Sequence, residues 1–165
     1  MTLAEAAAQA DVLAEQGSER ELAQLRASWD DEIEASARSR DYRERGVAFR
    51  AISQFRFRQK MELLRRGLED ESPACRGSAL ISLERLSRDA PGQVNAVRAL
   101  LHRIVSTDDN QAVRRLAAVS LRNGSPHRDT ITLLAGLAED DRLDRDLREV
   151  AAKVAASLKK KAGPR

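Results

Sequence analysis

Apolar residues recur every three or four positions through most of this chain, which is the spacing of a helix that buries one face. The pattern is clearest over residues 93–106 and 111–123, two apolar stripes separated by an acidic turn. We expect Asp108 and Asp109 in that turn to cap the second helix, and Gly124 to follow its end. Two helices this short leave an apolar face uncovered, so the pattern predicts further helices packed against them.

The same unit of two helices recurs along the sequence. The second helix of each unit carries an arginine that is followed three residues later by an alanine; the arginines are Arg45, Arg76, Arg114 and Arg148. The predicted second helices cover residues 41–54, 73–88, 111–123 and 144–160, and their partners cover 19–38, 56–69, 93–106 and 128–139. Helix pairs repeated at roughly 30–40 residues are typical of a solenoid. The sequence therefore predicts an all-α fold, a right-handed α-α superhelix of about four helix pairs.

An additional N-terminal helix is predicted within residues 1–17. Thr2 and Glu5 have the spacing of a capping box, and Ser18 with Glu21 offers a second one for the next helix. Trp29, the only tryptophan, lies on the apolar stripe of that next helix. Core packing is the favoured interpretation of Trp29, and an exposed contact is the alternative. We expect one domain over residues 1–160 and a basic flexible tail over 161–165.

The repeat also predicts how neighbouring pairs are joined. A small alanine lets the next helix approach closely, and the branched residue four positions later fills the adjoining gap. Each repeat arginine is expected to reach the acidic turn of a neighbouring pair.

Composition agrees with helices rather than sheet. Hydrophobic residues make up 42% of the chain but aromatic residues only 3%, so the core must consist of Leu, Ala, Val and Ile. Apolar runs stay below the roughly 20 residues that span a membrane. The N-terminus lacks the features of a secretory signal, and the single Cys75 gives no internal disulfide. These observations predict a cytoplasmic protein that does not enter a membrane.

The third repeat resembles a known family. An acidic Asp109 followed by Val113, Arg114, Ala117 and Leu121 is similar to HEAT repeats, including the bacterial HEAT-like type associated with phycobilisome lyases. The other repeats match less fully, and the second has Cys75 where the motif has valine. The resemblance implies a solenoid in which the second helices line a concave face.

Residues with reactive side chains do not form a catalytic or metal-binding pattern in the sequence. Cys75 is expected to be a packed thiol, and His102 and His127 lack metal-ligand spacing. The paired aspartates of the turns are expected to cap helices rather than to act as an acid/base couple. Glycines form no phosphate-binding loop. We therefore expect no enzyme activity, no catalytic residues, no cofactor and no metal.

The resemblance assigns a binding role to the concave face. The exposed positions of the second helices there, which we predict to contact a partner, are Arg50, Ile81, Arg85, Arg115, Val119, Arg122 and Lys153. This mixture of apolar and basic residues suits an acidic, partly apolar protein. The leading hypothesis is a non-catalytic scaffold or adaptor that binds another protein.

A basic block over residues 38–67 supports an alternative, nucleic-acid binding. Its candidate phosphate contacts are Arg56, Arg58, Lys60, Arg65 and Arg66. The HEAT-like alkylpurine DNA glycosylases bind DNA on such a surface, but the aromatic residues and aspartate that they use cannot be placed here. In the other interpretation, Phe55 and Phe57 cover a helix junction and the arginines are solvated. An accessory role like that of a bilin-lyase-like chaperone rests on the family resemblance alone. Neither the partner nor the oligomeric state follows from the sequence.

Overall fold

The computed structural model describes residues 1–164, which form ten α-helices, one short 3-10 helix and no strand. The predicted all-α fold is therefore confirmed. The helices fall into two compact units, Met1–Leu86 and Ser87–Arg165. The prediction of a single domain over residues 1–160 stays a prediction.

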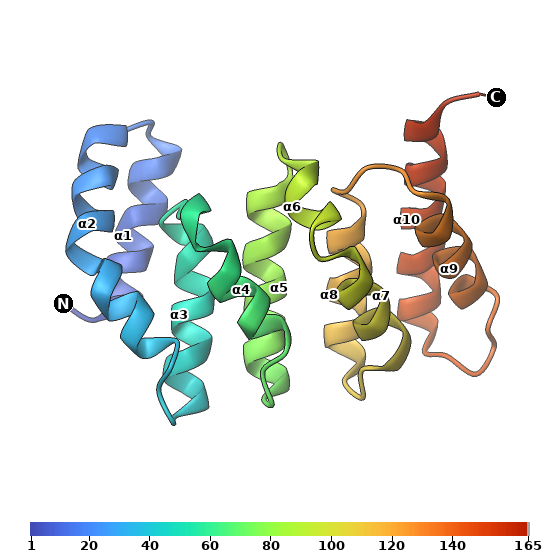
Figure 1. Ribbon diagram of the computed structural model, residues 1–165, viewed down its shortest axis with the longest axis horizontal. Coiled ribbons are helices and arrows are strands. Elements are labelled where there is room, and N and C mark those ends of the chain that lie inside the picture. The colour runs from blue at the N-terminus through green and yellow to red at the C-terminus, as the bar shows by residue number, and fades with distance from the viewer. Residues whose placement is uncertain (165) are drawn as a thin grey trace. The chain divides into compact units, whose positions relative to one another are not determined.

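The first unit has two layers of helices. Its elements are α1 (Leu3–Glu15), α2 (Glu19–Ser36), α3 (Tyr42–Gln54), the 3-10 helix η1 (Arg58–Lys60), α4 (Met61–Leu68) and α5 (Pro73–Ser87), whose last residue begins the second unit. Figure 1 shows α1, α3 and α5 in one layer, which we call the inner layer, with α2 and α4 in the other. The predicted helix over 56–69 is thus a 3-10 turn followed by a shorter α-helix.

Helix α1 packs on the repeats and is part of the first unit. Leu3, Ala6, Ala7 and Ala10 are buried, and α1 contacts both α2 and α3. The predicted capping box is confirmed, because the backbone N–H of Glu5 donates to the hydroxyl of Thr2 at 3.2 Å and the Glu5 carboxylate accepts from the N–H of Thr2 at 2.7 Å. The second capping box is wrong, since Ser18 makes no side-chain capping bond to α2.

Small residues bring α3, α4 and α5 together. The fully buried hydroxyl of Ser82 on α5 donates to the carbonyl oxygen of Phe49 on α3 at 2.5 Å. The backbone N–H of Ser53 donates back to that hydroxyl at 3.3 Å. A Cβ on Gly67 would lie 2.8 Å from the Cβ of Ala79 and 3.0 Å from the Phe49 ring. Glycine is therefore required where α4 crosses these two helices.

The second unit repeats the two-layer arrangement. Its helices are α6 (Pro91–Asn95), α7 (Arg98–Thr107), α8 (Gln111–Leu121), α9 (Arg128–Ala138) and α10 (Arg145–Ala162). In Figure 1, α8 and α10 lie in one layer and α7 and α9 in the other, as their contacts require. The single helix predicted over 93–106 is two helices. A Cβ on Gly124 would lie 2.8 Å from Val94, so the loop after α8 closely approaches α6.

Two predicted caps are wrong by one to four residues. Helix α8 is capped by Asn110, whose side chain accepts from the N–H of Val113 at 3.0 Å. Asp108 instead accepts from the N–H of Asn110 at 2.9 Å and holds the turn. Likewise Asp144, rather than Asp140 or its neighbour, caps α10. A cap must stand two or three residues before the N–H that it accepts, and the helices begin later than the acidic pairs suggest.

The repeat alanines are confirmed as packing positions, whereas the arginines have two different roles. Ala48, Ala79, Ala117 and Ala151 are all 0% exposed. Arg45 reaches the next acidic turn as predicted, with its Nε 2.9 Å from Asp70. Arg114 departs from the prediction, because it donates to the carbonyl oxygens of Val105 and Ser106 at 2.8 and 3.0 Å within its own pair.

The two remaining arginines also contact the turn that precedes their own helix. Arg76 donates to the carbonyl oxygens of Asp70 and Glu71 at 2.9 and 3.3 Å. Arg148 lies 3.7 Å from the carboxylate of Asp141. The recurring role of this position is therefore to bind the turn within its own pair, and Arg45 additionally binds the next one.

Candidate functional site

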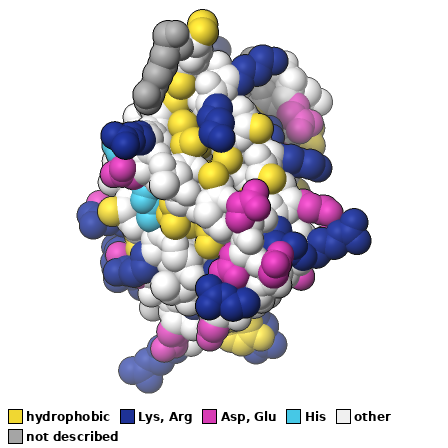
Figure 2. All heavy atoms as spheres, turned by 90° about the vertical axis from the view of Figure 1, so that its right-hand side faces the viewer, with side chains coloured by type: hydrophobic (Ala, Val, Ile, Leu, Met, Phe, Trp, Pro, Cys, Tyr) yellow, Lys and Arg dark blue, Asp and Glu magenta, His cyan; other side chains and the backbone are white. Residues whose placement is uncertain are grey.

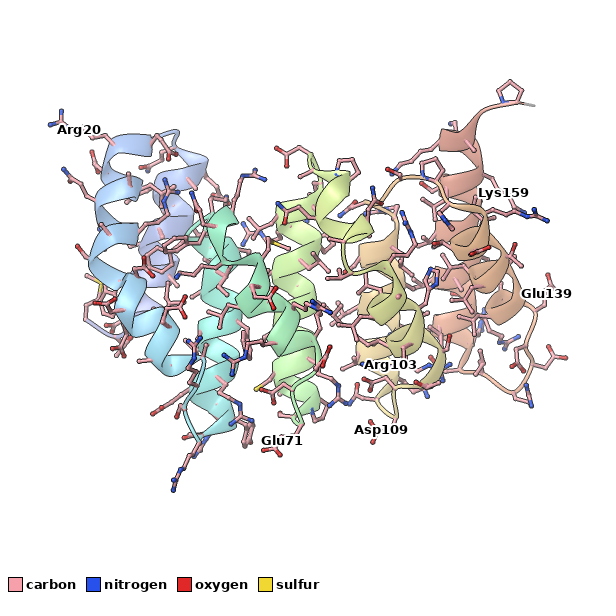
Figure 3. The ribbon with its side chains drawn as sticks, in the orientation of Figure 1. Arg20, Glu71, Arg103, Asp109, Glu139 and Lys159 are labelled. Atoms are coloured by element: carbon pink, nitrogen blue, oxygen red, sulfur yellow. The ribbon has the colours of Figure 1, made fainter. Side chains whose placement is uncertain are left out.

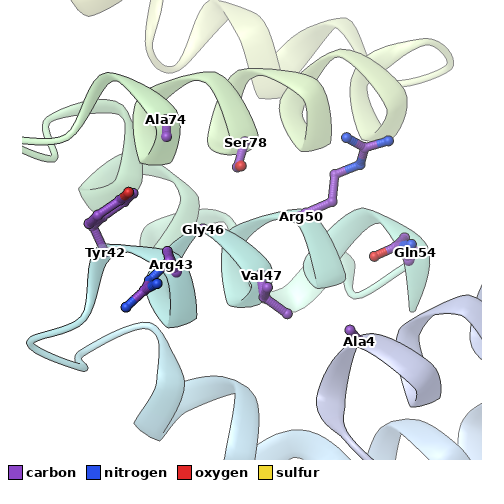
Figure 4. Close-up of a pocket in the computed structure, with 9 residues that line it drawn as sticks. All are labelled: Ala4, Tyr42, Arg43, Gly46, Val47, Arg50, Gln54, Ala74 and Ser78. Carbon is purple, nitrogen blue, oxygen red and sulfur yellow. The ribbon is translucent and has the colours of Figure 1, made fainter.

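The inner layer of the first unit contains a groove of about 460 Å³. Its walls come from α1, α3 and α5, and the lining residues are Ala4, Tyr42, Arg43, Gly46, Val47, Arg50, Gln54, Ala74 and Ser78. In Figure 4, Ala74 and Ser78 point from α5 toward α3, while Val47 points from α3 toward Ala4 of α1. The groove is thus floored by small residues and flanked by larger ones from α3.

The helical register of α3 explains which side chains enter the groove. Ala48 and Ile52, three and seven residues after Arg45, are fully buried in the core. Val47 and Arg50, two and five residues after Arg45, fall on the opposite face and are exposed. Val47 is 38% exposed and Tyr42, at the first turn of α3, is 51% exposed. Both side chains line the groove, and exposed apolar side chains in a concave surface are candidate contacts for a partner.

A second hollow of about 490 Å³ extends the groove toward the start of α1 and the second half of α2. It shares Ala4, Arg43 and Val47 with the groove and is also lined by Trp29. Trp29 is half-buried. The only tryptophan therefore lies at the edge of an open surface rather than deep in the core, between the two interpretations that its sequence position left open.

Of the two arginines that line the groove, one forms an ion pair within the chain and the other does not. Arg43 is bound to Asp41 at 3.2 Å and stands 6.0 Å from the centre of the Tyr42 ring. The hydrogen bonds between Arg43 and Asp41 lower the pKa of that carboxyl. Arg50 is exposed and has no ion-pair partner among residues 1–164. It is the cation of the groove that is available to a ligand.

A basic cluster adjoins the end of the groove. One carboxylate oxygen of Asp11 accepts from Arg56 at 2.8 Å and from Arg85 at 2.7 Å. Arg56 also donates to the carbonyl oxygen of Gln54, a lining residue. Burial disfavours the charged form of Asp11, but the bonds from the two arginines outweigh it and lower the pKa of the carboxyl. Two guanidinium groups share one carboxylate, so the cluster is positively charged.

The candidate phosphate contacts do not form a continuous surface. Lys60 is 8% exposed, lies 4.5 Å from the centre of the Phe57 ring, and binds Asp30 and Glu34 at 2.5 and 2.6 Å. Burial lowers the pKa of Lys60, but these two carboxylates outweigh that effect and raise it. Arg58 donates to the carbonyl oxygen of Leu86 at 3.1 Å. Arg65 and Arg66 are exposed on α4 in the other layer.

The remaining predicted contact residues are placed as follows. Ile81 is half-buried on α5 in the first unit. In the second unit Val119 is half-buried, whereas Arg122 and Lys153 are exposed. Arg115 on α8 binds Asp144 at 3.2 Å. Of the predicted residues, the structure brings Arg50 to the groove, and Arg85 and Arg56 to the adjoining cluster.

The reactive side chains singled out in the sequence are engaged in packing. Cys75 is fully buried, its Sγ lies 3.1 Å from the carbonyl oxygen of Tyr42, and burial raises the pKa of its thiol. His102 Nε2 lies 2.8 Å from the hydroxyl of Thr130, and burial lowers the pKa of the imidazole. Within residues 1–164, no three His, Cys, Asp or Glu side chains are grouped to hold a metal. In the same range, no helix is long and apolar enough to cross a membrane.

Comparison with known families identifies the repeat. Residues 31–122, more than half of the chain, match the family model for HEAT repeats. The chain belongs to the HEAT-repeat family. HEAT repeats form α-α solenoids and generally mediate protein–protein interactions. No curated protein and no solved structure matches the chain. Helices α9 and α10 lie outside the matched residues, but the buried Ala151 keeps the HEAT-repeat register in α10.

Sequence reasoning missed most of the groove. Tyr42, Arg43 and Val47 were not among the predicted contacts, which followed the register position of Arg50. Val47 lies two residues after the repeat arginine Arg45, and Arg43 and Tyr42 lie about one turn earlier on α3. Including these register positions among the predicted contacts would have indicated all three residues. Ala4 could not be found this way, because nothing in the sequence places α1 beside α3.

Proposed function

We propose that this HEAT-repeat protein is a non-catalytic adaptor whose groove in the first unit binds an acidic, partly apolar segment of another protein. The observation that carries the proposal is the exposure of Tyr42 and Val47 beside Arg50, a guanidinium with no ion-pair partner among residues 1–164. Aromatic side chains and arginine are the residues that most often dominate protein interfaces.

The shape of the groove supports a protein segment rather than a flat surface contact. Ala4, Gly46 and Ala74 are small, so the backbone or a side chain of a partner has room between α1 and α5. Apolar partner groups would cover Tyr42 and Val47. A carboxylate next to them would meet Arg50 and gain further attraction from the positive cluster at the end of the groove.

The ion pairs of the first unit favour a protein over a DNA backbone. Phosphate binding of a duplex needs several free cations in a row. Here Arg56 binds Asp11 and Lys60 is buried between two carboxylates. The exposed Arg65 and Arg66 lie on α4, away from the inner layer. They provide a matched control for the test below.

A comparison of three baits in native lysate tests the proposal: the unchanged protein, Arg50→Glu and Arg65→Glu. Both variants reverse one exposed charge on a helix of the first unit, and circular dichroism checks that each is folded. We expect the unchanged protein and Arg65→Glu to recover the same partner, and Arg50→Glu to recover about tenfold less of it. Equal recovery by all three baits contradicts the proposal. Recovery that is lost only with Arg65→Glu and is sensitive to nuclease supports nucleic-acid binding instead.

A further inference from the structure

Helix α10 of the second unit exposes a face whose equivalent in α3 and α8 is buried. In α3 the position four residues after the repeat arginine is Phe49, which is buried and accepts a hydrogen bond from the next helix pair. In α8 the same position is Ala118, which is also fully buried. In α10 it is Ala152, which is exposed. This side of α10 therefore corresponds to the packing face of α3 and α8, but no helix covers it among residues 1–164.

The exposed face extends along both α9 and α10. Ala152 and Ala156 are exposed one turn apart on α10, and the half-buried Ile131 and Ala135 are one turn apart on α9. Figure 2, which looks at the right-hand side of Figure 1, shows hydrophobic side chains gathered at the middle of this face and charged ones around its margin. The centre is apolar and nearly free of long side chains, so another helix can approach closely.

Charges on this face are separated between its two ends. Arg128 of α9 and Lys159 of α10 line the same hollow at one end. Glu139, which follows α9, and Glu149 in the second turn of α10 are exposed toward the other end. Figure 3 shows Lys159 and Glu139 near opposite ends of this helix pair. The face is thus positive at one end and negative at the other.

We propose that this face binds a second copy of the chain, with the two α10 helices antiparallel about a twofold axis. An axis passing near residue 154 places Ala152 opposite Ala156 of the second copy and Glu149 opposite its Lys159. Both pairs are centred on the same point, so one rotation satisfies them together. A twofold contact requires a self-complementary surface of this kind, because the same patch serves both copies.

The two parts of the face have different physical roles. The alanine seam lets the helices come close and removes apolar surface from water, which supplies most of the affinity. Glu149 also accepts from Arg145 at 2.9 Å within its own chain, and its side chain remains 53% exposed. Exposed ion pairs contribute little free energy. The Glu149–Lys159 contacts therefore set the antiparallel orientation, while the seam sets the strength.

Sedimentation equilibrium of the full chain over a range of concentrations tests the proposal. We expect the mass to rise with concentration from 18.3 kDa to about twice that value. Ala156→Glu places a charge in the seam and should raise the dissociation constant at least about tenfold. The matched control is Ala27→Glu, the same change at an exposed position of α2. It should leave the dissociation constant unchanged.

Charge reversal tests the orientation. Glu149→Lys or Lys159→Glu alone should raise the dissociation constant about fivefold, since each change creates two repulsive contacts per dimer. The two changes together should restore the original value. A chain that stays monomeric at all concentrations, or a dimer insensitive to Ala156→Glu, overturns the proposal. Failure of the double reversal to restore association overturns the antiparallel arrangement.

Discussion

Arg45 in the first unit and Arg114 in the second occupy the same position of the repeat but are stabilised by different partners. Arg45 forms a two-pronged contact with the carboxylate of Asp70, with Nε and an Nη at 2.9 and 3.0 Å. Arg114, which is 7% exposed, donates to two backbone carbonyl oxygens. A carboxylate can be neutralised by acid and a carbonyl cannot. At this repeat position, the contact made by α3 is therefore sensitive to pH and the contact made by α8 is not.

The same contrast holds beyond this position. The first unit joins distant segments through ion pairs such as Arg85–Asp11 and Lys60–Glu34, which connect α5 with α1 and η1 with α2. In the second unit the ion pairs around α10 are mostly local, such as Arg145–Glu149. Its helices are joined mainly by buried Leu, Val and Ala side chains. Ion pairs thus join distant helices of the first unit, and in the second unit Arg115–Asp144 joins α8 to the turn before α10.

Asp70→Asn should have the largest effect and is confined to the first unit. The substitution keeps the shape and the hydrogen bond from the Ser72 N–H, but removes the nearer of the two carboxylates around Arg45, whose side chain is only 11% exposed; the other, Glu71, lies 3.8 Å away. We expect a loss of about 3 kcal/mol of unfolding free energy at pH 7. Urea unfolding followed by Trp29 fluorescence measures it, because the only tryptophan is in the first unit.

The loss of unfolding free energy caused by Asp70→Asn should become smaller as the pH falls. Burial raises the pKa of Asp70, but the hydrogen bonds from Arg45 outweigh it and hold the pKa below the ordinary 3.8. The unfolded chain therefore binds the proton first, and the stabilisation is present above pH 3.8 and lost as pH falls through the folded value. The difference between the two proteins should shrink between pH 5 and about pH 2. A difference that stays constant over this range would show that Asp70 acts through shape alone.

A pair of glycine substitutions tests packing in each unit with the same chemical change. Gly67→Ala should destabilise the protein by about 1–3 kcal/mol, because the new methyl would lie 2.8 Å from Ala79. Gly136→Ala in α9 meets nothing within 4 Å and should stabilise it by about 0.5–1 kcal/mol through helix propensity. Thermal unfolding by circular dichroism measures both changes. Shifts of the same sign would mean that α4 does not pack on α5 as closely as described.

Arg114→Met should have a smaller effect than Asp70→Asn, and it acts in the second unit. The change removes two hydrogen bonds to Val105 and Ser106 but keeps most of the side-chain volume, so a loss of about 1–2 kcal/mol is expected. Because neither carbonyl titrates, the loss should be the same at pH 3 and pH 7, in contrast to Asp70→Asn. Urea unfolding followed by circular dichroism at both pH values measures it, and a loss that vanishes in acid would contradict the comparison of the two arginines.

The sequence by itself determined the local structure and the repeat. Apolar spacing predicted the helices, and the recurring arginine and alanine identified which face of α3 or α8 is buried, as Ala48 and Ala117 show. These properties depend on residues a few positions apart, so they are readable from a single chain. Caps were predicted less accurately, because Asn110 rather than the more conspicuous Asp108 and Asp109 stands at the required distance.

Only the tertiary structure decided which side chains meet across the fold. Asp11 and Arg85 are 74 residues apart, yet they form an ion pair because α1 lies in the inner layer with α3 and α5. The groove depends on the same placement, since Ala4 forms one of its walls. The spacing of apolar residues predicts which face of a helix is buried, but it does not identify the helix that packs against that face. That choice depends on how the helices pack, which is a property of the whole unit.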